Sequence, residues 1–190
     1  DTATGITVNS ALSASNDLIL LGDRMNLNAG VSSTGGAITI AANTGGLPID
    51  LGTKTVGTLG LNASELGMIT ASNGPLFIGD TSAGDLTVSA PVTFSNIGDL
   101  HLTTGGTLAV NSALTNASQG AIHLTADTMN IGAAVTGGGD INIAAASRFR
   151  DILLGSEFVG FLSLTDSELD LLNPGSGTLR ITNDGKEGIF

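Results

Sequence analysis

Residues 51–78 read LGTKTVGTLGLNASELGMITASNGPLFI, and residues 154–181 read LGSEFVGFLSLTDSELDLLNPGSGTLRI. The two stretches align without a gap at an offset of 103 residues, and their leucines and glycines recur at the same places. Upstream, Ile38-Thr39-Ile40-Ala41-Ala42 matches Ile141-Asn142-Ile143-Ala144-Ala145. The chain is therefore nearly two copies of one unit of about 103 residues, and such a repeat is typical of stacked architectures.

A shorter pattern runs through both copies. Triplets of the form apolar–any–apolar alternate as a strand does when one of its faces is buried. Gly, Asn, Ser, Thr and Asp, the residues of turns, separate them. The triplets begin at Ile6, Leu18, Met25, Ile38, Leu59, Leu76, Leu86, Leu100, Leu108, Ile122, Met129, Ile141, Leu162 and Leu179.

Two tandem globular domains would also give a duplication, but no Pro-rich or charged linker separates the copies. We therefore predict an all-β fold, a parallel β-helix (β-solenoid) of about nine coils, roughly five to a unit. It forms one continuous domain over residues 1–190, made of units at about 1–105 and 106–190, the second incomplete. Aromatic residues are only 3% of the chain, which suits a narrow core of stacked Leu, Ile, Val and Ala.

Two segments interrupt the strand pattern. Thr165 with Glu168, and Asn62 with Glu65, have the spacing of a capping box, in which the two side chains bond the backbone at a helix start. We predict single helical turns near residues 62–69 and 165–172. The four residues are expected to cap these turns and to perform no chemistry.

The net charge of −11, from 17 acidic and 6 basic residues, excludes the basic footprint of a nucleic-acid-binding protein. The longest apolar runs are far shorter than the ~20 residues of a membrane-spanning helix, so membrane insertion is not expected. The chain has no cysteine and hence neither a disulfide nor a thiolate zinc site.

The repeat resembles the filamentous-haemagglutinin-like proteins of bacteria. The resemblance rests on Leu59-Gly60-Leu61 with Glu65-Leu66, on Leu76-Phe77-Ile78-Gly79-Asp80, and on Gly84-Asp85-Leu86-Thr87-Val88. It implies a right-handed β-helix that is secreted or displayed on the outer cell surface of a Gram-negative bacterium, as part of an adhesin or extracellular fibre. It carries over no catalytic residues. Expected partners are glycans or surface proteins, and neighbouring solenoid segments placed end to end.

Three features of the sequence are candidate sites. His101 and His123 are the middle residues of triplets about one coil apart, with Asp99 nearby as a third ligand, but isolated exposed histidines are commoner and no metal site is expected. Gly137-Gly138-Gly139-Asp140 lacks the spacing of calcium-binding glycine-aspartate turns, so it is expected to be a plain turn. Weak Ca²⁺ binding by Asp80, Asp85 or Asp99 stays open, and no cofactor is otherwise expected.

The third feature is Arg148-Phe149-Arg150, which replaces Gly45-Gly46-Leu47 of the first copy. It is either a turn variant or a contact point for a partner or glycan, and the sequence does not decide between them. The acidic and basic residues form no cluster of the kind that polysaccharide-processing β-helices need. We therefore expect a structural shaft without catalytic activity. The alternatives are a carbohydrate-binding or polysaccharide-processing β-helix and, less favoured because the outward residues are mixed, an ice-binding solenoid.

Overall fold

The computed structural model describes residues 5–183 and is almost entirely β-structure, with 45% of the residues in strands and 4% in helices. Every pairing between its strands is parallel. Parallel neighbours cannot be joined by a hairpin, so the chain has to travel around the molecule between one strand and the next in the same sheet.

The longest sheet has seven strands. In spatial order these are β3 (Leu18–Leu21), β6 (Ile38–Ala41), β10 (Leu76–Ile78), β13 (Leu100–Thr103), β16 (Ile122–Thr125), β19 (Ile141–Ala144) and β23 (Leu179–Thr182).

A second face is built from a five-stranded sheet with a strand pair near each end. The sheet contains β8 (Leu59–Asn62), β7 (Ile49–Gly52), β11 (Leu86–Val88), β14 (Thr107–Val110) and β17 (Thr128–Ile131). The pairs are β1 (Gly5–Val8) with β4 (Arg24–Leu27), and β20 (Ile152–Leu154) with β21 (Leu162–Leu164). Because β4 lies beside β8 and β17 lies beside β21, the pairs continue the same face.

The third face consists of two shorter sheets. One contains β2 (Leu12–Ala14), β5 (Val31–Ser33) and β9 (Ile69–Thr70), and the other contains β12 (Val92–Phe94), β15 (Leu114–Asn116), β18 (Val135–Gly137) and β22 (Leu172–Asn173).

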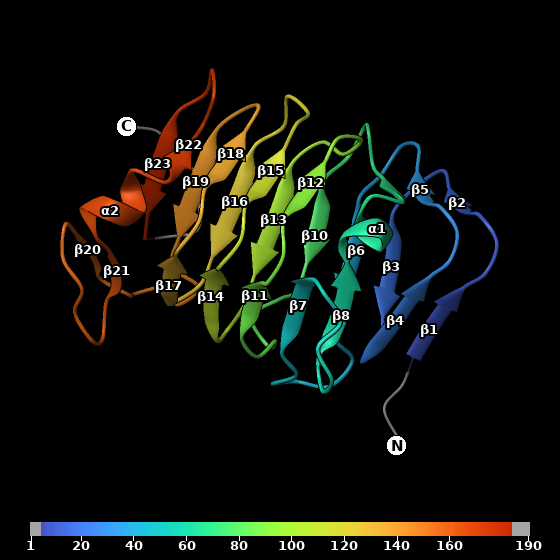
Figure 1. The fold of residues 1–190 in the computed structure, drawn as a ribbon, viewed down its shortest axis with the longest axis horizontal. Coiled ribbons are helices and arrows are strands. Elements are labelled where there is room, and N and C mark those ends of the chain that lie inside the picture. Colours follow the sequence, from blue (N-terminus) through green and yellow to red (C-terminus); the bar gives the residue numbers. More distant parts are fainter. Residues whose placement is uncertain (1–4, 184–190) are drawn as a thin grey trace.

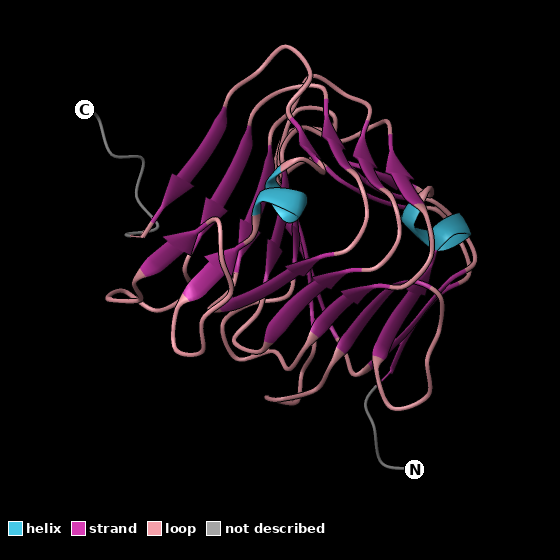
Figure 2. Ribbon diagram, turned by 60° about the vertical axis from the view of Figure 1, so that its left-hand side comes forward, coloured by secondary structure: helices cyan, strands magenta, loops and turns pink. Residues whose placement is uncertain are grey.

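The chain visits the three faces in turn. It passes through β13, β14 and β15 and then enters β16, which pairs with β13, so each circuit stacks on the one before. Figure 1 shows the circuits arranged along the long axis in sequence order, and Figure 2 shows the strands gathered into separate faces around the interior. The fold is compatible with a parallel β-solenoid, and the ladder from β13 to β16 crosses the boundary between the two repeat units without a break.

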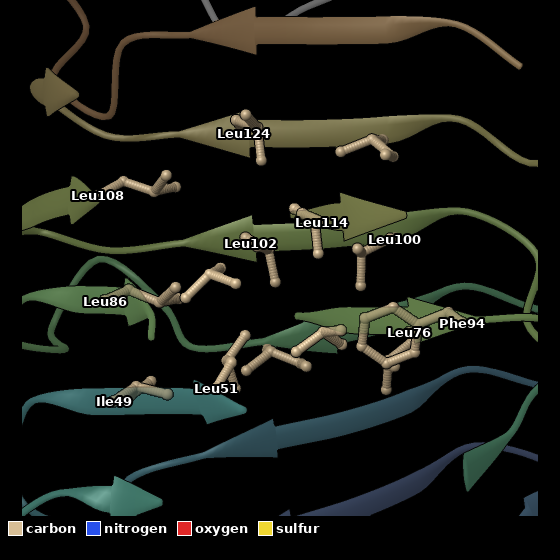
Figure 3. Packing of buried hydrophobic residues seen from close by; sticks show 14 of the residues in the cluster. Ile49, Leu51, Leu76, Leu86, Phe94, Leu100, Leu102, Leu108, Leu114 and Leu124 are labelled. Atoms are coloured by element: carbon tan, nitrogen blue, oxygen red, sulfur yellow. The ribbon is translucent and has the colours of Figure 1, made fainter. Parts of the chain in front are cut away.

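The core consists of columns of apolar side chains that point inward from successive strands (Figure 3). The paired register fixes the columns, and the inner members have no solvent exposure. Such stacking removes apolar surface from water along the whole length of the molecule. The first column of the seven-stranded sheet is Leu18, Ile38, Leu76, Leu100, Ile122, Ile141 and Leu179, and the second is Leu20, Ile40, Ile78, Leu102, Leu124, Ile143 and Ile181.

One circuit in each unit is longer than the others because it contains an additional strand. After β7 the chain loops back through residues 53–58 and forms β8, which inserts between β7 and β4. In the second unit β21 inserts in the same way between β20 and β17. Gly52 and Gly57, at φ of 104° and 84°, make the turns of the first loop, and Gly155 and Gly160 make those of the second.

These longer circuits change the expected number of coils. The prediction of about nine coils, five to a unit, is not confirmed. The longest sheet has seven strands within residues 5–183, and the 103-residue offset carries β6 to β19, four strands along that sheet. A uniform coil of about 20 residues does not hold, because β8 or β21 and the helical turn after it lengthen one circuit in each unit.

Both helical turns predicted from the sequence are present, as α1 (Ala63–Leu66) and α2 (Asp166–Leu169). The Asn62 side chain accepts a hydrogen bond from the Glu65 N–H, while the Glu65 carboxylate accepts one from the Asn62 N–H. Thr165 and Glu168 make the same reciprocal pair. Across residues 5–183, no helix has the length and apolar content needed to cross a membrane.

Candidate functional site

The middle residues of the seven-stranded sheet point away from the core and lie opposite one another in register. We call this set the outward row. It contains one threonine, so it lacks the repeated threonines of an ice-binding face. Its members are Ile19, Thr39, Phe77, His101, His123, Asn142 and Arg180.

Three aromatic rings stack at the centre of the outward row. His101 and His123 are direct partners in the β13–β16 ladder, and their rings lie nearly parallel with centroids 4.0 Å apart. Phe77 packs on the side of His101 away from His123, at a centroid distance of 4.5 Å. The two histidines, which are about one coil apart in the sequence, are therefore neighbours on one outer face, and both rings are half-buried.

Asp99 joins the two histidines. It lies two residues before His101, and alternate residues of an extended segment point to the same side. One carboxylate oxygen of Asp99 and one ring nitrogen of each histidine all lie within 4.8 Å of one another. In the described part of the chain, no other group of three or more His, Cys, Asp or Glu side chains brings its ligand atoms this close together.

The local environment keeps the His101 imidazole neutral at ordinary pH. Burial lowers the pKa of His101, the charge of His123 lowers it further, and Asp99 raises it, so that the pKa falls from 6.5 to about 4. A neutral imidazole has a free lone pair, which is the form that binds metals.

Asp99 also belongs to a recurrent structural device. Its carboxylate accepts a hydrogen bond of 2.7 Å from the N–H of Ala121, which lies just before the next strand of the sheet. Asp17, Asp85 and Asp140 accept equivalent bonds of 2.8 Å from the N–H groups of Ala37, Thr107 and Thr178. These aspartates join one circuit to the next, and Asp140 after the three glycines has this role.

The three aspartates considered as calcium ligands, Asp80, Asp85 and Asp99, do not form one cluster. Asp80 accepts hydrogen bonds from Ser82 and from the N–H of Ala83 within its own turn. Asp85 is bonded to the next circuit, and Asp99 lies with the histidines. No two of these three aspartates share a hydrogen-bond donor among the described residues, so nothing in their arrangement favours a calcium site.

A cavity of about 300 Å³ lies at the loop between β20 and β21. The Arg150 guanidinium, Phe158, Phe161, Glu157 and Ser163 are among its lining residues. The two phenylalanine rings meet edge to face at 5.6 Å. One guanidinium nitrogen of Arg150 donates weakly to the Phe161 carbonyl oxygen at 3.5 Å, whereas its buried Nε has no hydrogen-bond partner.

The structure separates Arg150 from Arg148 and Phe149, the other two residues of the predicted partner contact. Arg150 enters the cavity, whereas Arg148 and Phe149 are exposed, Phe149 to 92%. Phe158 and Phe161 were not predicted as site residues from the sequence. The signal for them was available in the alignment of the two copies, where they replace Thr55 and Thr58.

The two copies also differ beside the capping glutamate. In the first copy Lys54 Nζ lies 2.6 Å from the carboxylate of Glu65, which is buried and also accepts a hydrogen bond from the N–H of Leu27. The residue equivalent to Lys54 in the second copy is Glu157. Burial raises the pKa of Glu157, and a hydrogen bond with Glu168 and the charge of that residue raise it further.

The pKa of Glu168 is shifted in the opposite direction. Burial raises its pKa, but hydrogen bonds from the N–H groups of Thr165 and Ile131 and from the Thr165 hydroxyl outweigh burial and hold the pKa below its usual value. Glu168 therefore stays ionised, and Glu157 takes up the proton first as the pH falls.

No family model matches this chain, and no curated protein or solved structure matches it either. What the chain does has to be inferred from its own residues. Those residues offer three arrangements: the apolar columns, the cluster of Asp99, His101 and His123, and the cavity around Arg150.

Proposed function

We propose that this chain is a shaft segment of a secreted or cell-surface adhesin or extracellular fibre, without catalytic activity, built as one right-handed parallel β-helix. The observation that carries the proposal is the ladder of the seven-stranded sheet, which takes strands from both repeat units in one direction. Nearest-neighbour stacking of this kind gives a quasi-one-dimensional element that extends by adding circuits. An extended element of this kind suits a spacer between a cell and a binding region.

The polar groups support a structural role. Asp17, Asp85, Asp99 and Asp140 each bond the next circuit, and Glu65 and Glu168 cap helical turns. Asp50 is buried and accepts hydrogen bonds from Thr53, Thr55 and Ser89. Burial raises the pKa of Asp50, but these bonds outweigh burial and lower it, so the carboxylate stays ionised as a structural acceptor.

The resemblance to filamentous-haemagglutinin-like proteins supplies the location in this proposal: the outer surface of a Gram-negative bacterium. It also suggests neighbouring solenoid segments as partners. In keeping with that, β20 pairs only with β21 among the described strands, and Leu154 is 49% exposed. The equivalent Leu51 is fully buried beneath β11. The surface around Leu154 is thus what a following circuit would cover.

The shaft role is tested by placing the chain between an outer-membrane anchor and a fluorescent reporter domain. Energy transfer from the reporter to a membrane dye then gives the height of the reporter. Seven strands at about 4.8 Å predict that the chain raises the reporter by about 30 Å. A flexible Gly/Ser linker of equal residue number is the control, and because such a coil spans on the order of 75 Å with a broad spread, the chain should give a lower and much narrower distribution of heights. A distribution as broad as that of the linker argues against the proposal.

The cavity at Arg150 favours a second candidate, a carbohydrate-binding β-helix. Phenylalanine rings suit the apolar faces of sugars, and an arginine suits their carboxylate groups, which it can hold with two hydrogen bonds. A glycan array, read with and without calcium, tests this candidate. The matched variants restore residues of the first copy: Arg150→Leu, Phe158→Thr and Phe161→Thr.

The array separates the two candidates. Binding that disappears in the three variants would assign the cavity to a glycan and make the chain an adhesive segment. Equal signals from the parent and the variants, or none from either, would leave the shaft as the function. Cleavage of a bound polysaccharide would contradict both non-enzymatic roles.

A further inference from the structure

We propose that Asp99, His101 and His123 bind one divalent transition-metal ion of the Zn²⁺ type on the outer face of the seven-stranded sheet. The inference is independent of the shaft role. It rests on the distances among the three ligand atoms and on the backbone register that sets them.

The backbone places the three residues. Parallel strands lie about 4.8 Å apart, so residues in direct register on neighbouring strands keep their side chains within reach of a common ion. His101 and His123 have this relationship, and residues 100–103 pair with residues 122–125 around them. Asp99 lies on the same side as His101 and is held by the N–H of Ala121, which comes two residues before His123. No loop has to be ordered to bring the ligands together.

The hydrogen bond to Asp99 also orients it. The Ala121 N–H bonds one carboxylate oxygen at 2.7 Å, and a carboxylate oxygen of Asp99 lies within 4.8 Å of both ring nitrogens. Outer contacts of this kind fix the direction of a ligand before the metal arrives. Asp99 thus acts both as a bond between circuits and as an oriented ligand.

The set of donors selects the class of metal. Two imidazoles and one carboxylate suit Zn²⁺ and its transition-metal neighbours, whereas Ca²⁺ and Mg²⁺ require mostly oxygen ligands. Three protein ligands leave the fourth position of a tetrahedral zinc ion to water. The net charge of −11 adds a general attraction for cations.

Binding requires a small movement of the rings. Ligand atoms bound to one tetrahedral zinc ion at 2.0–2.1 Å lie about 3.4 Å apart, less than the 4.8 Å within which these atoms lie. The lone pairs of two stacked, parallel imidazoles also lie in parallel planes and so do not meet at one point. The His101 ring is stacked between Phe77 and His123, and the register partner of His123 on the following strand is Asn142. Metal binding should therefore separate the stacked rings.

The test is a calorimetric titration of Zn²⁺ into the full chain, prepared without a polyhistidine tag, together with NMR of the histidine rings. The site variants are His101→Thr, His123→Thr and Asp99→Asn. Threonine already occupies the outward row at Thr39, and asparagine can still accept the Ala121 hydrogen bond, so each variant should keep the fold. The control is Asp85→Asn, because Asp85 accepts the same kind of bond from Thr107 but is not part of the cluster of Asp99, His101 and His123.

The expected result is one Zn²⁺ per chain, with the affinity reduced ~10-fold or more in each site variant and unchanged in Asp85→Asn. Zinc should also shift the ring signals of both histidines, because a nitrogen of each ring binds the ion. Ca²⁺ should produce neither effect. The proposal is overturned if the parent takes up no Zn²⁺ at millimolar concentration. It is equally overturned if the parent and the His101→Thr/His123→Thr double variant, both folded by circular dichroism, bind Zn²⁺ with the same affinity.

Discussion

Glu157 lies against Glu168 in the second copy, at the place where Lys54 forms an ion pair with Glu65 in the first. The two capping boxes are otherwise alike, and each glutamate also bonds a backbone N–H of the neighbouring strand, that of Leu27 or that of Ile131. One side chain therefore reverses the electrostatics of a shared structural element, and the two copies serve as controls for each other.

Replacing Glu157 by lysine should stabilise the chain. The variant Glu157→Lys exchanges a repulsion between carboxylates for the ion pair of the first copy. Because Glu157 is exposed, the gain should be about 1 kcal/mol or less, which raises Tm by about 2–4 °C at most. Thermal unfolding followed by circular dichroism at pH 7 measures the change. The reciprocal Lys54→Glu should lower Tm, and a rise in Tm in both variants would refute the electrostatic explanation.

The effect of Glu157 should depend on pH. Its folded-state pKa is raised, so the penalty of its charge is complete above that pKa and vanishes below the unfolded value of 4.5. The neutral variant Glu157→Gln should therefore melt at a higher temperature than the parent at pH 7, and the difference should disappear as the pH falls below about 4.5. A difference in Tm that is constant from pH 7 to pH 4 would contradict the raised pKa.

Shortening a buried leucine of the core should destabilise the chain, whichever copy carries the change. Leu59 and Leu162 are equivalent positions on the two additional strands, and neither has any solvent exposure. Leu59→Ala or Leu162→Ala should lower the free energy of unfolding by about 2–5 kcal/mol through the cavity left behind. Urea denaturation measures the loss. Val56→Ala and Val159→Ala, at side chains that are 99% and 96% exposed, are the controls and should change it little.

Glycines at the stacked turns should not tolerate a methyl group. A Cβ on Gly120 would meet the carbonyl oxygen of Gly98 on the preceding circuit well inside contact distance, and backbone atoms cannot rotate away. Gly120→Ala should therefore lose about 1–3 kcal/mol or more. Gly45→Ala is the matched control, since its Cβ would find only the Ser82 carbonyl oxygen, at 3.8 Å. Equal unfolding midpoints for the two variants would show that the turns relax.

The sequence predicted the strands of two faces well. All fourteen apolar triplets lie within strands, because both inward positions of those strands carry large apolar side chains. The third face was missed for a physical reason. Three of its strands place a small or polar residue at one inward position, as Ser33, Asn116 and Gly137 do, and these residues do not produce an apolar alternation. β12 is the exception, because Val92 and Phe94 both point inward and form an apolar triplet that was overlooked.

The buried polar residues of these strands have hydrogen-bond partners. Ser33 donates to the Asn16 carbonyl oxygen, and the Asn116 amide donates to the carbonyl oxygens of Gly98 and Gly120. No single-sequence pattern shows such partners as Asn16 and Gly98 in advance, since they come from other circuits. The cavity at Arg150 was only partly foreseen for a similar reason. Phe158 and Phe161 reach Arg150 through the loop-back turn, whose path depends on the pairing of β20 with β21.

The additional strands have a geometrical consequence. Each unit places one more strand on the face that contains β7 and β8 than on the face of the seven-stranded sheet, while neighbouring strands keep a spacing of about 4.8 Å on both. One side of the molecule is thus longer than the other by about one strand spacing per unit. Circuits stacked on such unequal sides fan out, so a long array of these units would follow an arc, with β8 and β21 on the convex side. The curvature of the fibre would then be set by how often a loop-back segment occurs along the chain.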